Sequence, residues 1–166
     1  MKTAAYAGTV RSLSINDEPI ESSGAQSVYQ SAIDELTRRY GAGDETWQLD
    51  LEEFRPPLGI FLVARVDTHP AGCVGVRAIG DPDLRLGEVK RLWVRPDLRR
   101  SGVAAALMAD IEERARMTGY HQLYLETGEA QPEAQALYPK LSWDQVDDFP
   151  PGAFSHRLAT RFTKVL

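Results

Sequence analysis

Residues 88–104 constrain the fold of this chain most, because a strand must end there and a helix must begin within a few residues. The run from Glu88 to Val94 predicts a strand, and Pro96 cannot continue a central ladder. A helical pattern of apolar residues starts directly after Gly102. Free backbone N–H groups at a helix start, beside arginines, form a site for phosphate. The segment therefore predicts a strand, an anion-binding turn and a helix in succession.

The rest of the pattern predicts one α/β domain over residues 1–166, with a mixed central sheet flanked by helices. Apolar residues at helical spacing predict helices over 28–40, 103–115 and 132–141. Apolar or alternating runs predict strands over 10–15, 60–66, 73–79, 86–94, 120–127, 142–146 and 158–166. Turn residues fill 67–72, and long loops are expected over 41–57 and 147–156.

Charge is unevenly distributed along the chain. Residues 85–100 carry six basic side chains against two acids, whereas residues 17–53 carry ten acids against two arginines. Both stretches can be solvated faces, or the first can receive a polyanionic cofactor and the second a cationic acceptor. The net charge of −5 argues against a nucleic-acid partner.

The sequence gives no sign of a membrane segment, a disulfide or a metal site. No apolar run approaches the length of a membrane span, and residues 1–14 lack a signal-peptide pattern, so a cytoplasmic location is expected. Cys73 is the only cysteine, and the three histidines are scattered without metal-ligand spacing.

Three motifs occur in an order that resembles the GNAT (GCN5-related) N-acetyltransferase family. The first is the strand 88–94, and the second is Arg99-x-x-Gly102-x-Ala104, which is similar to the family's Arg/Gln-x-x-Gly-x-Gly/Ala. The third is Gln131-x-x-Ala134-x-x-Leu137-Tyr138, which is similar to the family's Asn-x-x-Ala-x-x-Leu-Tyr. The resemblance implies the GNAT fold and transfer of acetyl from acetyl-CoA directly to a primary amine. It also makes a homodimer one expected state.

The resemblance implies a cofactor site made largely of backbone groups. The pyrophosphate is expected on the turn that contains Arg99, Arg100, Ser101, Gly102, Val103 and Ala104. The pantetheine arm is expected along the strand at Leu92, Trp93 and Val94, where a backbone N–H also polarises the thioester carbonyl. Gln131 stands where the family often has a CoA-contacting Asn. No metal is implied.

Two side chains are predicted to carry the proton transfers. The resemblance implies that Tyr138 protonates the CoA thiolate, although a tyrosine on a helix can equally be a core residue. Glu88 is the candidate base for the amine, and burial in its strand would raise its pKa. Alternation puts residues 88, 90 and 92 on one face, so Glu88 can instead pair with Lys90. Glu126 or water is the alternative route for the proton.

The acetyl acceptor is the component of the expected reaction that the sequence determines least. Its lid is expected from the first helix and the loops 41–57 and 147–156. The acids of these segments favour a small cationic amine; they are Asp34, Glu35, Asp44, Glu45, Asp147 and Asp148. A protein or peptide amine is an alternative acceptor. A non-catalytic acyl-CoA sensor is an alternative function, which the presence of Tyr138 and Glu88 disfavours.

Overall fold

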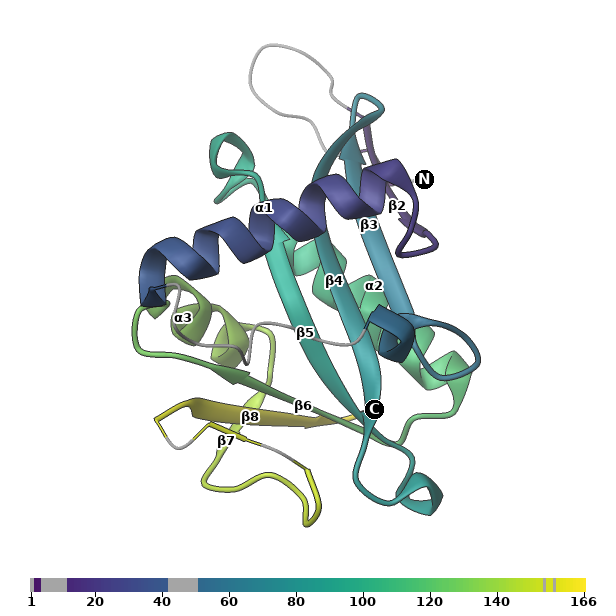
Figure 1. Ribbon diagram of the computed structural model, residues 1–166, viewed down its shortest axis with the longest axis vertical. Helices are drawn as coiled ribbons and strands as arrows, with labels where there is room; N and C mark the ends of the chain where they lie inside the picture. The colour runs from purple at the N-terminus through teal and green to yellow at the C-terminus, as the bar shows by residue number, and fades with distance from the viewer. Residues whose placement is uncertain (1, 4–11, 42–50, 154, 157) are drawn as a thin grey trace.

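An eight-stranded sheet forms the centre of the computed structural model, in the order β1-β2-β3-β4-β5-β6-β8-β7 (Figure 1). The structure describes residues 2–3, 12–41, 51–153, 155–156 and 158–166. Its strands are β1 (Lys2–Thr3), β2 (Ser12–Asp17), β3 (Ile60–Val66), β4 (His69–Ile79), β5 (Leu86–Val94), β6 (Gln122–Thr127), β7 (Asp144–Val146) and β8 (Thr160–Val165). Its helices are α1 (Ser23–Tyr40), α2 (Val103–Thr118) and α3 (Pro132–Lys140), with 3₁₀ turns η2 (Leu51–Phe54), η3 (Pro82–Leu84) and η4 (Pro96–Leu98). The predicted succession of elements is confirmed from β2 onward.

The differences from the predicted boundaries have local causes. The turn before β4 needs just Asp67 and Thr68, whose φ angles of 49° and 73° suit a tight hairpin turn, so β4 begins at His69 rather than at residue 73. Part of the predicted loop 41–57 forms η2, and its residues 42–50 lie outside the described residues. Strand β1 was not predicted, because two residues carry no periodicity.

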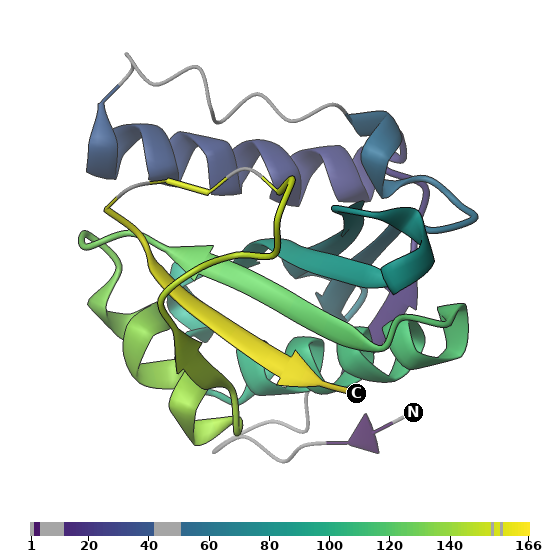
Figure 2. The same ribbon diagram turned by 90° about the horizontal axis from the view of Figure 1, so that it is seen from below.

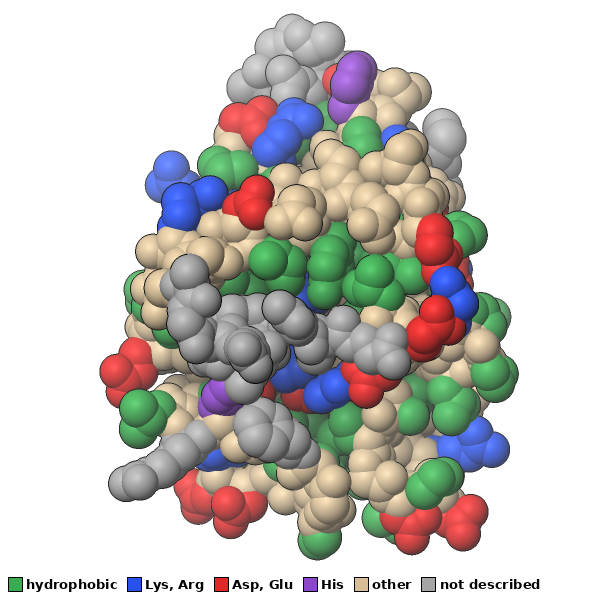
Figure 3. Space-filling model, viewed as in Figure 1, with side chains coloured by type: hydrophobic (Ala, Val, Ile, Leu, Met, Phe, Trp, Pro, Cys, Tyr) green, Lys and Arg blue, Asp and Glu red, His purple; other side chains and the backbone are tan. Residues whose placement is uncertain are grey.

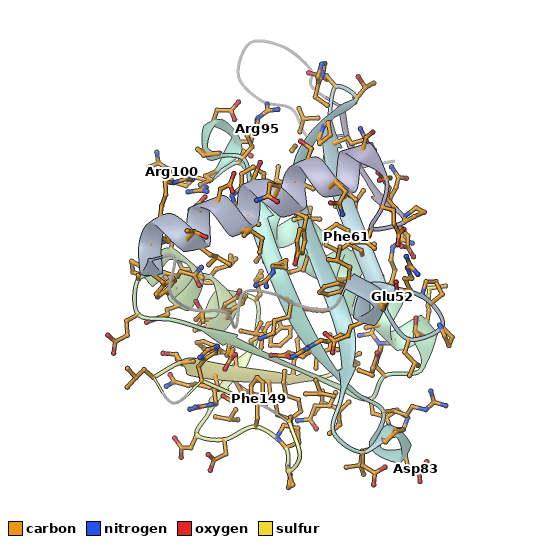
Figure 4. The ribbon with its side chains drawn as sticks, in the orientation of Figure 1. Glu52, Phe61, Asp83, Arg95, Arg100 and Phe149 are labelled. Carbon is orange, nitrogen blue, oxygen red and sulfur yellow. The ribbon has the colours of Figure 1, made fainter. Side chains whose placement is uncertain are left out.

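The helices cover both faces of the sheet. Figure 2 shows α1 on one face and both α2 and α3 on the other. Two separate groups of buried apolar side chains follow from this arrangement. Leu107 and Ile111 of α2 belong to the larger group, together with Val74 and Leu123 of the sheet. The smaller group lies under α1 and includes Phe61, which Figure 4 labels on that face of the sheet.

A bulge in β5 changes the expected alternation of its side chains. Lys90 pairs with Gly75 while Trp93 pairs with Cys73, so β5 has one more residue than β4 between these two pairs. Arg91 has φ 60°, which is the backbone conformation that accommodates the extra residue. Leu92 therefore packs with the α2 side of the sheet and Trp93 with the α1 side. The prediction that residue 92 shares a face with residues 88 and 90 was wrong for this reason.

Strands β5 and β6 are paired over a short length and then separate. They run parallel, and their pairing covers just residues 86–88 of β5 and 122–124 of β6. The other strand pairs are antiparallel, with β6 pairing with β8 along its full length. Figure 1 shows β5 and β6 diverging beyond the paired region. The backbones of these two neighbouring strands are therefore separate over their carboxyl-terminal halves, with α1 on one side, and we call this separation of the backbones the opening.

Candidate active site

The turn after β5 lies at the open end of this gap. Arg100 has φ 60° and Gly102 has φ 90°, so two of the three residues before α2 have a left-handed backbone conformation. The first hydrogen bond of α2 runs from the Ala106 N–H to the Gly102 carbonyl at 3.0 Å. The N–H groups of residues 103–105 therefore precede the helical ladder and point out of the helix start. This geometry suits an anion such as a phosphate.

The two arginines of this turn have different environments. Arg99 bends back onto the sheet: its Nε donates to the Val94 carbonyl at 2.9 Å, and its Nη2 forms an ion pair with Glu35 of α1. Arg100 is exposed and lies beside α1 in Figure 4. Ser101 caps the preceding turn by donating its hydroxyl hydrogen to the Leu98 carbonyl. Arg99 is thus already held by protein groups, whereas Arg100 points to solvent.

The last residues of β5 present backbone groups to the opening. The Arg95 N–H donates to the Ala71 carbonyl of β4 at 2.8 Å, and Trp93 pairs with Cys73 on that same side. Backbone groups alternate in direction along a strand, so those of Leu92 and Val94 face away from β4 and toward the opening. One of them, the Val94 carbonyl, is occupied by Arg99.

A buried network of charged side chains links β4, β5 and β6 near the point where the opening begins. Glu88 has no exposed surface; its Oε2 accepts from Arg77 of β4 at 2.9 Å, and its Oε1 lies 2.6 Å from the Lys90 ammonium. Lys90 also reaches Glu126 of β6 at 3.1 Å. Arg77 reaches Glu53 of η2 at 2.6 Å, which extends the network to the surface on the α1 face. The expected pairing of Glu88 with Lys90 is present, and so is the expected burial.

The Lys90–Glu126 pair lies where the backbone pairing of β5 and β6 ends. The last paired position is Glu88 opposite Tyr124. Residues 90 and 126 each lie two residues further along these parallel strands, so they lie opposite each other. Glu126 also accepts hydrogen bonds from the Ser155 hydroxyl and the His156 N–H, both at 2.9 Å. Burial alone would raise the pKa of Glu126, but Lys90 and these hydrogen bonds outweigh it and lower that pKa. Glu126 is therefore ionised at neutral pH.

Tyr138 lies on the opposite face of the sheet from this network. It is 6% exposed, and its ring centroid lies 5.4 Å from that of Phe162 and 6.2 Å from that of Trp143. No described residue forms a hydrogen bond with its hydroxyl. Burial raises its pKa, so the phenol keeps its proton at any pH near neutral. Tyr138 is thus both a core residue and a protonated phenol.

The comparisons with known proteins agree with this geometry. The sequence pattern of the acetyltransferase (GNAT) family matches residues 25–143. The chain belongs to this family. An IAA acetyltransferase from Azospirillum brasilense is 36% identical over 129 residues, which are 76% of this chain and 83% of that protein. This chain is therefore an enzyme, an acetyltransferase of the GNAT family.

Solved structures confirm the GNAT fold. A GNAT acetyltransferase from Staphylococcus aureus has a TM-score of 0.77 at 16% identity, over 93% of this chain and 99% of that one. A GNAT acetyltransferase from Elizabethkingia anophelis, with acetyl-CoA bound, has a TM-score of 0.64 at 17% identity, over 93% and 98%. The mixed sheet and the arrangement of its helices are therefore those of the family.

Other predicted site residues of the acetyltransferase have partners within the protein. Gln131 directly precedes α3, and its side-chain oxygen accepts a hydrogen bond from the Thr127 hydroxyl at 2.9 Å. Sequence reasoning missed Arg77, which holds Glu88, and placed Glu35 among the acids of the acceptor lid rather than as the partner of Arg99. Neither residue belongs to a motif, so no local signal pointed to these two ion pairs.

The described acids that were expected to attract a cationic acceptor are either bonded to protein groups or exposed at the surface. Asp34 accepts from Gln30 on the surface of α1, and Glu35 is neutralised by Arg39 and Arg99. Asp44 and Glu45 lie outside the described residues, and residues 147–148 are exposed. Figure 3 shows acidic side chains interspersed with Lys and Arg on the α1 face. Among the described residues, no helix is long and apolar enough to cross a membrane, and no acid, His and Cys side chains cluster as metal ligands.

Proposed function

We propose that this acetyltransferase moves acetyl from acetyl-CoA directly to the primary amine of a small molecule. The observation that carries the proposal is the opening between β5 and β6, which ends at the Arg99–Ala104 turn. In the proposed complex the pyrophosphate lies on the N–H groups at the start of α2, and the pantetheine arm lies along Leu92, Trp93 and Val94. The acetyl-CoA bound in the Elizabethkingia protein supports this choice of cosubstrate.

The proposed reaction uses the two faces of the sheet differently. The amine nitrogen attacks the thioester carbonyl from the α1 face, the C–S bond breaks, and the CoA thiolate takes the Tyr138 proton on the α3 face. A backbone N–H of β5 donates to the developing oxyanion, an interaction that is typically worth about 3 kcal/mol. Tyr138 has a proton to donate when the thiolate forms, because a phenol is protonated at neutral pH; the burial that raises its pKa makes it a weaker acid than a solvent-exposed tyrosine.

We propose Glu88 as the acceptor of the amine proton. Because Glu88 has no exposed surface, the proton reaches it through water or through Glu126, which lies nearer the opening. Arg77 and Lys90 flank the carboxylate and give it a fixed position. Arg77 stays protonated, so the proton path ends at Glu88, and the ion pair of Arg77 with the exposed Glu53 holds the guanidinium in place.

Replacing Glu88 by Gln keeps the shape of the side chain and removes its capacity to take a proton. We expect kcat/KM to fall about tenfold, since solvent still takes up part of the proton flux. Glu53→Gln is the matched control, because it removes the exposed partner of Arg77 and leaves Glu88 in place. The pH–rate profiles and melting temperatures of both variants are measured together. A Glu88→Gln profile that matches that of Glu53→Gln would exclude Glu88 from the reaction.

The acceptor class is tested by a free-thiol release assay with acetyl-CoA. The panel contains polyamines, aminoglycosides, neutral amines, amino acids, and peptides with a free N-terminus or lysine. Turnover on a small amine is expected, and the resemblance to an IAA acetyltransferase supports a small-molecule acceptor. A preference for polyamines would support a cationic acceptor, whereas turnover on peptides alone would establish the alternative acceptor. Binding of acetyl-CoA without turnover on any amine would favour the sensor. The cytoplasmic location and the homodimer stay predictions.

A further inference from the structure

Glu35 is the point at which α1 joins the end of β5 and the turn after it. Its side chain is 15% exposed, and its carboxylate accepts hydrogen bonds from three side chains. Arg39 of its own helix lies 2.6 Å away, the Trp93 indole N–H donates at 2.8 Å, and the Arg99 guanidinium completes the set. Burial alone would raise the pKa of Glu35, but the bonds from Arg99, Trp93 and Arg39 outweigh it.

The partners of Glu35 belong to the expected cofactor site. Trp93 lies between the two positions whose backbone faces the opening, and Arg99 is the first residue of the phosphate turn. Arg99 uses Nε on the Val94 carbonyl and Nη2 on Glu35, so two anchors fix the guanidinium at the edge of the opening. A guanidinium has five N–H donors, so others remain for a phosphate.

Arg39 continues the connection to the other side of the opening. It donates to the Ala130 carbonyl at 2.7 Å and forms an ion pair with Glu133 at the start of α3. One turn of α1 therefore contacts the β5 side through Glu35 and the β6–α3 side through Arg39. These contacts hold the two edges of the opening at a fixed separation on the α1 side.

We propose that Glu35 is a positioning residue for acetyl-CoA, which acts by holding Arg99 and the end of β5 in the conformation that binds the pyrophosphate. The proposal rests on the assignment of the Arg99–Ala104 turn to the pyrophosphate. Glu35 is itself an anion, so a carboxylate that merely competed with the phosphate for Arg99 would weaken binding. Removing the charge of Glu35 should therefore raise KM for acetyl-CoA if Glu35 positions Arg99, and lower it if Glu35 competes with the phosphate.

The test compares Glu35→Gln with Glu113→Gln, which removes an exposed α2 carboxylate that is also paired with an arginine of its own helix, Arg116. Glu35→Gln is expected to raise KM for acetyl-CoA about tenfold with little change in kcat, the size expected when a charge-assisted hydrogen bond is lost. Glu113→Gln is expected to change neither constant. An unchanged or lowered KM in Glu35→Gln would overturn the proposal.

A double-mutant cycle with Arg99→Gln separates positioning from a general loss of stability. If Glu35 acts through Arg99, Glu35→Gln has little further effect on KM once Arg99 is replaced. Additive effects on KM would assign Glu35 a structural role and overturn the proposal. Gly102→Val is measured in parallel. If it leaves acetyl-CoA binding intact, the assignment of the turn fails; if it weakens binding while Glu35→Gln does not, the role of Glu35 alone fails.

Discussion

Replacing Tyr138 by Phe is expected to lower kcat by about 100-fold while the fold is retained. The reason is that the CoA thiolate would then leave without a neighbouring proton donor, whereas the Tyr138 phenol of the native enzyme carries a proton at neutral pH. The hydroxyl bonds to no described residue, so its loss leaves no buried partner unsatisfied and stability should change little. Single-turnover kinetics of thiol release measure the chemical step directly.

Tyr120 provides the matched control for this substitution. It is also buried, and its hydroxyl donates to the Leu58 carbonyl at 2.8 Å. Tyr120→Phe should therefore lower the free energy of unfolding by about 1 kcal/mol and leave kcat unchanged. A Tyr138→Phe enzyme with the native single-turnover rate would show that Tyr138 is solely a core residue, packed on Trp143 and Phe162.

Replacing Gly102 by Val is expected to weaken acetyl-CoA binding by on the order of 50-fold. Gly102 has φ 90°, a conformation that a β-branched residue rarely adopts, so the turn must rearrange before α2. Among the described residues beyond its two chain neighbours, no atom lies within 4 Å of a Cβ built there, so the expected loss comes from the backbone rather than from a steric clash. Isothermal titration with acetyl-CoA measures the affinity.

The control is Gly119→Val at the other end of the same helix. Gly119 has φ 96° and similarly open surroundings, so the backbone strain is comparable. It lies at the end of α2 away from the phosphate turn, and its substitution should lower the melting temperature and leave the affinity unchanged. Equal losses of affinity in both variants would mean that Gly102 is needed just for the stability of α2 and that the turn does not hold the pyrophosphate.

The sequence predicted the elements well where one local rule dominated. Pro96 ended β5 and Gly102 preceded α2, as expected from a missing N–H group and a missing Cβ. The bulge at Arg91 was not predictable, since no residue type there requires φ 60°, and it moved Leu92 to the other face of the sheet. A single inserted residue reverses all later side-chain directions in a strand, so Leu92 and Trp93 lie on the opposite faces from those that alternation predicts. The predicted use of the backbone at Leu92 and Val94 does not depend on these faces.

The order of motifs by itself determined the family and predicted the phosphate turn and the candidate acid, because these depend on residue types at fixed local spacing. The separation of β5 from β6 and the partners of the charged residues were decided by the tertiary structure alone. Arg77 lies 11 residues from Glu88, and Glu35 lies 64 residues from Arg99, so neither pair forms until the sheet and α1 are in place. Charges at such separations are paired by packing, and no spacing in the sequence encodes their contact.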